Sequence, residues 1–172
     1  DVLFADLEGD DGIPEIALGR LPVLTAQELN DYSAKIQGHE ATAAGEWQRQ
    51  ILLTADNPDE AGNFTADSET LAAMLPAAGY SATSVYLDAV SAAVGKEKVL
   101  KEINGETDSG GAIILNYIGH GALDRLADEN LLVNADVARL VNGDRLPLFL
   151  GMLAWSAVFF FIGVRRFNKR FA

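Results

Sequence analysis

The sequence predicts an α/β protein, a three-layer sandwich in which a mainly parallel β-sheet carries helices on both faces. Short apolar segments alternate with segments whose apolar residues recur at helical spacing, which is typical of βαβ units. The apolar segments are hydrophobic along nearly their whole length, as expected of parallel strands that are buried on both faces. The chain has 172 residues, of which 49% are hydrophobic and 22% are charged, so it can bury the core of one domain.

Strands and helices alternate in the predicted order. A capping box, in which Thr25 and Glu28 exchange hydrogen bonds, marks the start of the first helix. We expect the strands to lie in the order 2-1-3-4, and we expect the first crossover to be right-handed. The predicted strands span 50–55, 82–87, 111–118 and 148–152, and the predicted helices span 26–44, 68–78, 95–104 and 134–141.

The chain divides into three parts by composition. We predict an N-terminal acidic segment with its connecting helix (1–45), an α/β domain (46–152) and an apolar run with a basic end (153–172). The chain begins at Asp1 rather than Met. We therefore interpret it as a piece of a longer protein or as a processed form.

Charge and composition exclude several classes of function. The chain has 13 Lys and Arg against 25 Asp and Glu, a net charge of −12, which would repel nucleic acid. It has no cysteine, which excludes disulfides, cysteine-ligated zinc and a cysteine nucleophile. His39 and His120 are its only histidines, which excludes a His-rich metal site. We expect no nucleic-acid partner and no metal centre.

The C-terminal part of the chain could form either a membrane-spanning helix or a strand of the sheet. Leu146 to Val164 is an uncharged run, and residues 165–172 hold four basic residues and no acidic one. Such a run before basic residues resembles a membrane span with a cytoplasmic C-terminus, so residues 146–170 are a candidate for membrane association. The alternative is a strand at 148–152, which leaves a remainder too short to cross a bilayer. We expect the strand to form and the remainder to be a projecting apolar helix.

Residues with useful chemistry follow the predicted strands at the edge where parallel α/β sheets place their sites. His120 leaves the third strand between Gly119 and Gly121. Glycines there would let a ligand approach the backbone and leave the Gly121 amide free to donate. A histidine in this place is a candidate general base. The alternative is a strand-exit turn whose histidine only faces solvent.

Two acidic stretches allow more than one interpretation. Residues 56–60 follow the first strand, and three interpretations are open for them: a solvated turn, a cation site, or a pocket in which an acidic side chain recognises a basic substrate group. Residues 6–12 (DLEGDDG) resemble half of a calcium loop, but Ala17 stands where an EF-hand has its last glutamate. A solvated turn is favoured there. We therefore expect no cofactor, with calcium as the alternative.

Four stretches together resemble the gingipain-type cysteine peptidases, which share a caspase- or flavodoxin-like three-layer sandwich. They cover nearly the whole chain up to Met152. They are IPEIALGRLPV with the helix after it (13–44), ILLTADNPDEAGNF (51–64), LNYIGHGA (115–122) and LLVNADVARLVNGDRLPLFLGM (131–152). The resemblance implies a Cys–His dyad with His120 as its histidine and the Gly121 amide as an oxyanion donor. It also implies a peptide or protein substrate and an extracytoplasmic or secreted location.

The sequence departs from the family pattern at the nucleophile. Leu153 and Ala154 stand where the pattern has Thr-Cys, so Ala154 holds the position of the expected cysteine. We predict a fragment or degenerate form of a gingipain-like cysteine endopeptidase, inactive by the family mechanism because that mechanism needs a thiolate. Asp56 would be its substrate-binding acid, favouring Lys or Arg at the cleaved position. The alternative is a non-catalytic, membrane-tethered module that binds a peptide or protein.

Overall fold

The computed structural model describes residues 5–8, 13, 15–16 and 21–153 of the chain. Contacts divide the chain into two compact units, residues 1–41 and 42–172. The predicted division at 45 and 152 stays a prediction.

The first unit contains one helix, α1 (Ala26–Ala41), among its described residues. The Glu28 backbone N–H donates to Oγ1 of Thr25 at 3.1 Å, and the Thr25 backbone N–H donates to Oε2 of Glu28 at 3.1 Å. These two bonds satisfy backbone donors that the first turn of a helix leaves open. The predicted capping box is therefore confirmed.

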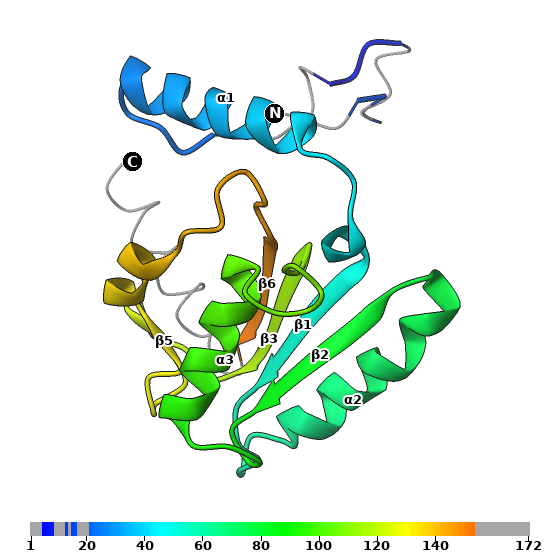
Figure 1. The fold of residues 1–172 in the computed structure, drawn as a ribbon, viewed down its shortest axis with the longest axis vertical. Coiled ribbons are helices and arrows are strands. Elements are labelled where there is room, and N and C mark those ends of the chain that lie inside the picture. Colours follow the sequence, from blue (N-terminus) through cyan, green and yellow to red (C-terminus); the bar gives the residue numbers. More distant parts are fainter. Residues whose placement is uncertain (1–4, 9–12, 14, 17–20, 154–172) are drawn as a thin grey trace. The chain divides into compact units, whose positions relative to one another are not determined.

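The second unit is built on a four-stranded parallel sheet (Figure 1). Its strands are β1 (Gln50–Ala55), β2 (Ser81–Tyr86), β3 (Ile114–Gly119) and β6 (Leu148–Leu153). Their order is β2-β1-β3-β6, and each neighbouring pair is parallel. The short helix η2 (Glu46–Arg49) leads into β1. The predicted order is confirmed, and the predicted strand positions agree to within one residue, except that β3 begins at Ile114 rather than at residue 111.

Helices cover both faces of this sheet, as predicted. Because side chains alternate along a strand, Ile51, Leu53 and Ala55 of β1 pack on α2 (Phe64–Met74). Leu52 packs on the opposite face, in the core that contains Val99 and Ile103 of α3 (Ala92–Asn104). The three-layer sandwich therefore has a separate apolar core on each side of the sheet.

Two helices begin earlier than predicted because their caps were not recognised. Oδ1 of Asn63 accepts from the Ala66 N–H at 3.0 Å, so α2 begins at Phe64 rather than at residue 68. Oγ of Ser91 accepts from the Val94 N–H at 3.4 Å and starts α3 at Ala92. A short helix, η3 (Pro76–Ala78), follows α2.

The segment between β3 and β6 holds a small hairpin, β4 (Arg125–Leu126) and β5 (Leu132–Val133), and a 3₁₀ helix, η4 (Asn134–Arg139). The helix predicted for 134–141 is therefore present, but as a 3₁₀ helix that ends at Arg139. Asn104 of α3 donates from Nδ2 to the Arg139 carbonyl at 3.1 Å and accepts the Val141 N–H at 2.8 Å. These bonds replace the ones that a longer helix would have made.

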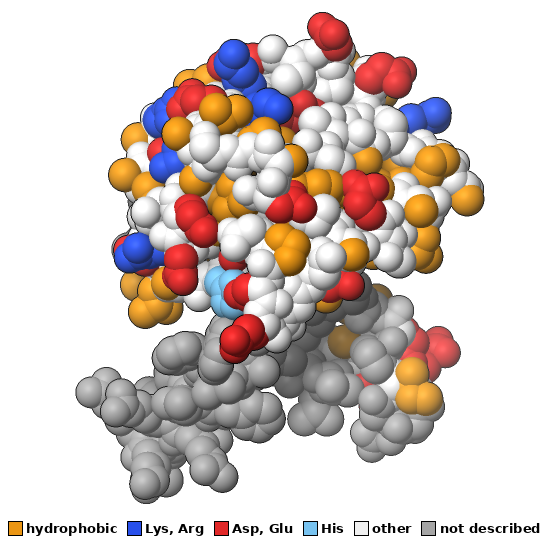
Figure 2. Space-filling view, turned by 90° about the horizontal axis from the view of Figure 1, so that it is seen from below, with side chains coloured by type: hydrophobic (Ala, Val, Ile, Leu, Met, Phe, Trp, Pro, Cys, Tyr) orange, Lys and Arg blue, Asp and Glu red, His pale blue; other side chains and the backbone are white. Residues whose placement is uncertain are grey.

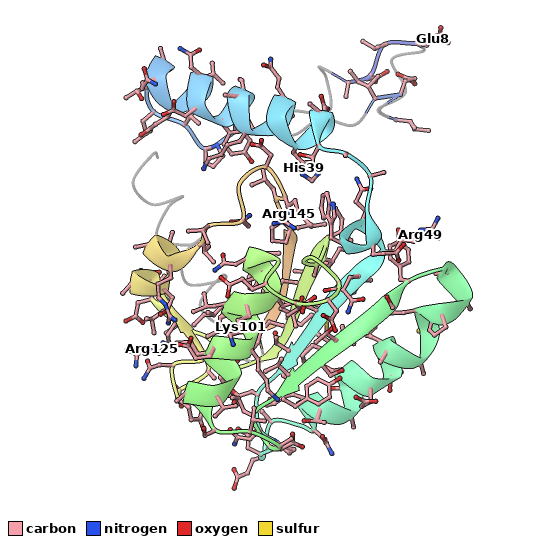
Figure 3. All side chains as sticks on the ribbon, viewed as in Figure 1. Glu8, His39, Arg49, Lys101, Arg125 and Arg145 are labelled. Carbon is pink, nitrogen blue, oxygen red and sulfur yellow. The ribbon has the colours of Figure 1, made fainter. Side chains whose placement is uncertain are left out.

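Arg145 lies at the amino edge of the sheet, where the strands begin, and connects two segments there by hydrogen bonds (Figure 3). Its guanidinium donates to the carbonyls of Gly110 and Asn104, at 2.5 and 3.4 Å. The segment that enters β6 is thereby attached to the loop that enters β3.

The strand at the start of the C-terminal apolar run has formed. Leu148–Leu153 pairs with β3 along its whole length, so a single helix over Leu146 to Val164 is not what these residues adopt. Within the described ranges, no helix is long and apolar enough to cross a bilayer. The predicted projecting helix falls on residues outside the described part of the chain.

Candidate active site

Asp56 and His120 meet at the carboxyl edge of the sheet. Asp56 follows β1 and His120 follows β3, and because these strands are parallel neighbours, both residues leave the sheet at the same edge. Oδ2 of Asp56 lies 3.0 Å from Nδ1 of His120 and accepts the His120 backbone N–H at 3.1 Å. The side chain of Asp56 is 3% exposed and that of His120 is 20% exposed. A buried carboxylate on Nδ1 sets the tautomer and the direction of the ring.

Two further residues hold the imidazole. Oδ2 of Asp59 lies 3.4 Å from Nε2, and the Asp59 side chain is 40% exposed. The Phe64 ring meets the imidazole edge-on, with centroids 5.2 Å apart and planes at 88°. Acidic side chains gather beside a histidine on the face seen in Figure 2. The His120 ring contacts three side chains, so the alternative of a histidine that only faces solvent does not hold.

Asn57 completes the environment of Asp56. Its backbone N–H donates to Oδ1 of Asp56 at 2.9 Å. With its amide turned so that donors face acceptors, its side chain donates to the same oxygen at 3.1 Å and to Oε1 of Glu129 at 2.9 Å. Both carboxylate oxygens of Asp56 are therefore engaged within the protein, one by Asn57 and one by His120.

Gly121 follows the histidine and leaves its amide available. It forms an isolated antiparallel bridge with Leu126, made by the Ala122 N–H to the Arg125 carbonyl and the Ala127 N–H to the His120 carbonyl, both at 2.9 Å. This pairing does not use the Gly121 N–H, and no described residue accepts a hydrogen bond from it. A backbone N–H in this state suits an oxyanion.

Of the predicted site residues, the structure describes Asp56, His120 and Gly121, and all three lie at this edge. Ala154 lies outside the described residues. The acidic stretch 6–12 is described only in part, and across the described ranges no group of three His, Asp or Glu side chains is arranged to hold a metal ion. The calcium alternative stays a prediction.

Sequence reasoning missed the contacts of Phe64 and Glu129 with this site. Phe64 was missed because it lies before the predicted start of its helix. No local signal marked Glu129, which lies nine residues after the histidine in the hairpin loop.

This fold and site define a class of protein: an α/β sandwich with a carboxylate-oriented histidine and a donor amide at the edge of its sheet. A histidine so held can accept and return a proton at Nε2. The model of Peptidase family C25 matches residues 1–153, and the chain belongs to this family. No match was found among curated proteins.

A solved structure supports the fold. The complex of the pro- and mature domains of RgpB from Porphyromonas gingivalis superposes with a TM-score of 0.62 at 20% sequence identity. The match covers 88% of this chain and 36% of that chain, so our chain spans about a third of its length. The predicted resemblance to gingipains and the caspase-like sandwich are therefore confirmed.

Proposed function

We propose that these 172 residues form a degenerate cysteine-endopeptidase domain that keeps the base half of the proteolytic site and lacks its nucleophile. The observation that carries the proposal is the Asp56–His120 pair, 3.0 Å apart, in a chain without cysteine. In a Cys–His site the histidine activates a thiol and then protonates the leaving amine. Without a thiol the first step has no nucleophile.

Within this proposal Asp56 orients His120 rather than binding substrate. Its carboxylate is almost fully buried, and both oxygens have partners within the protein. Asp59 is the acid of the same turn that remains accessible to a basic substrate group. The Gly121 N–H would hold the carbonyl oxygen of a bound peptide.

A second candidate function is peptide or protein binding without hydrolysis. An oriented histidine and a donor amide can hold a peptide whether or not a nucleophile is present. The RgpB structure is a complex of a pro- and a mature domain, which makes a polypeptide partner a reasonable proposal here. By family membership we also propose an extracytoplasmic location.

The first test is hydrolysis. The purified chain is incubated with peptides that carry Lys, Arg or a neutral residue at the cleaved position, and we expect no turnover. Turnover that survives repurification and disappears in His120→Ala would contradict the proposal, because it would require a nucleophile other than a thiol.

The second test restores the thiol. We expect the thiol introduced by Ala154→Cys to react with iodoacetamide at pH 6 about tenfold faster than the thiol of a matched Leu153→Cys variant, because a nearby imidazole lowers a thiol pKa by a unit or more. Adding His120→Ala should abolish this difference. Equal rates in all variants would show that His120 does not serve position 154. If the thiol is activated, cleavage of basic and neutral peptides at equal rates would refute a specificity acid.

A further inference from the structure

The carbonyl of His120 accepts two hydrogen bonds, and neither donor belongs to the pair described above. The Tyr117 hydroxyl donates at 2.6 Å and the Ala127 backbone N–H donates at 2.9 Å. Tyr117 is fully buried in β3 and Ala127 is buried in the loop between β4 and β5. A tyrosine inside a β-strand therefore turns its hydroxyl toward the residue that leaves the same strand.

The backbone beside these two donors is strained at Ala127 and tightly packed at Gly119. Ala127 has φ of 59°, in the left-handed region that a residue with a Cβ rarely adopts. At Gly119 a Cβ would overlap both the Tyr117 hydroxyl and the Cβ of Asp56. The strand exit is thus closed tightly on Tyr117 and Asp56.

We propose that Tyr117 is a positioning residue for His120, whose hydroxyl fixes the peptide that carries the imidazole so that Nδ1 meets Asp56. The inference rests on the proposed role of His120 as the base of a peptidase site. Asp56 holds the backbone N–H and the ring, while Tyr117 and Ala127 hold the carbonyl. With its N–H and its carbonyl both hydrogen-bonded, the backbone of His120 is fixed, and the Cα that carries the ring stays within reach of Asp56.

The Tyr117 hydroxyl stays a hydrogen-bond donor at neutral pH. Burial raises the pKa of Tyr117 well above its ordinary value, and the negative charge of Asp56 raises it further. The hydroxyl therefore keeps its proton and can hold the His120 carbonyl.

The experiment must distinguish the positioning of His120 by the Tyr117 hydroxyl from the packing of the Tyr117 ring in the core. Its ring belongs to the core on the α3 face, together with Leu52 and Val99. Tyr117→Phe keeps the ring and removes only the donor. Tyr86→Phe is the matched control, because Tyr86 is a buried tyrosine of β2 in the core on the α2 face.

The test is ¹⁵N and ¹H NMR of the imidazoles in the full chain. His39 lies in the first unit and serves as an internal reference for His120. In Tyr117→Phe we expect the His120 Nδ1 proton to exchange with solvent about three- to tenfold faster, the factor that loss of one hydrogen bond gives. The His120 ring signals should move as well. The signals of His39, and both histidines in Tyr86→Phe, should stay unchanged.

The proposal is overturned if Tyr117→Phe lowers the free energy of unfolding but leaves the His120 ring signals and proton exchange unchanged. Tyr117 would then only pack. This readout needs no nucleophile, so it is independent of the test with Ala154→Cys. An unactivated thiol combined with a Tyr117-dependent imidazole would refute the peptidase assignment and keep the positioning role.

Discussion

At the scale of single residues, the site depends on a position without a side chain. Gly119 immediately precedes His120, and a methyl group there would overlap Asp56 and Tyr117. We expect Gly119→Ala to lower the free energy of unfolding by about 1–3 kcal/mol, the usual cost of overpacking. Urea denaturation measures this loss. We also expect the hydrogen bond between Asp56 and His120 to weaken.

A matched glycine on the neighbouring strand provides the control. Gly151 lies opposite Tyr117 in the register of β3 and β6, and a Cβ there would meet only the Phe149 ring, at 3.3 Å. Phe149 is half exposed and can move aside. Equal losses in Gly119→Ala and Gly151→Ala would show that the strand exit is not especially tight.

At the scale of elements, η4 is attached to α3 by ion pairs. Nζ of Lys96 lies 2.8 Å from Oδ2 of Asp136, which also accepts the Val133 N–H at 3.0 Å. Burial alone would raise the pKa of Asp136, but Lys96 and the Val133 N–H outweigh it and leave this pKa below its ordinary value. A carboxylate with a lowered pKa in the folded state stabilises the protein above its unfolded pKa. That stabilisation is lost as the pH falls through the folded pKa.

Asp136→Asn should therefore cost about 1–2 kcal/mol of unfolding free energy at neutral pH. The difference from the natural sequence should shrink as the pH falls below the ordinary pKa of an aspartate and through the lowered pKa of Asp136. Chemical denaturation at a series of pH values measures both effects. Asp124→Asn is the control, since the Asp124–Arg125 pair is solvent-exposed and contributes little. A cost for Asp136→Asn that does not change with pH would show that the charge is not involved.

At the scale of the whole molecule, the sheet ends in an apolar strand. Leu148, Phe149, Leu150 and Met152 of β6 are 44–59% exposed, and among the described residues β6 pairs only with β3. Edge strands of soluble proteins usually carry charges that prevent edge-to-edge pairing. β6 carries none. We therefore expect the protein to associate with itself through this strand.

Leu150→Lys should weaken this association about tenfold, because a lysine blocks the edge and one leucine contributes about 1.5–3 kcal/mol when buried. Sedimentation velocity at several concentrations measures it. Met74→Lys adds the same charge at an exposed apolar position of α2 and should have no effect. Association that is equally strong in both variants would place the contact elsewhere in the chain.

The C-terminal run gives a separate prediction for membranes. Deleting residues 155–172 should reduce binding to anionic lipid vesicles, because it removes an apolar segment and four basic residues. Deleting only 165–172 separates the charge from the apolar segment. Unchanged vesicle binding after the longer deletion would exclude this segment as the anchor.

Strands β1, β3 and β6 were predictable because each one is a short, mostly apolar segment whose neighbours in sequence already mark its ends. The residues that cap the helix N-termini were harder to recognise in the sequence. Thr25 and Glu28 signal a helix start as a pair, whereas Asn63 acts alone, and isolated asparagines are equally common in turns. The helix predicted for 134–141 has formed only up to Arg139, and its end was not readable from its own residues. Asn104, a residue of another element, binds the Arg139 carbonyl and the Val141 N–H.

The sequence by itself determined the parallel sheet, the place of His120 at a strand exit and the lack of a thiol, because each is written in local pattern or composition. The tertiary structure decided the partners of His120. Asp56 lies 64 residues away, and it meets the imidazole only because β1 and β3 become neighbours. Tyr117 reads as one more apolar residue of a buried strand, and its contact with the His120 carbonyl exists only once the chain turns at Gly119. Side-chain contacts between strands are set by packing over the whole sheet, which no local segment encodes.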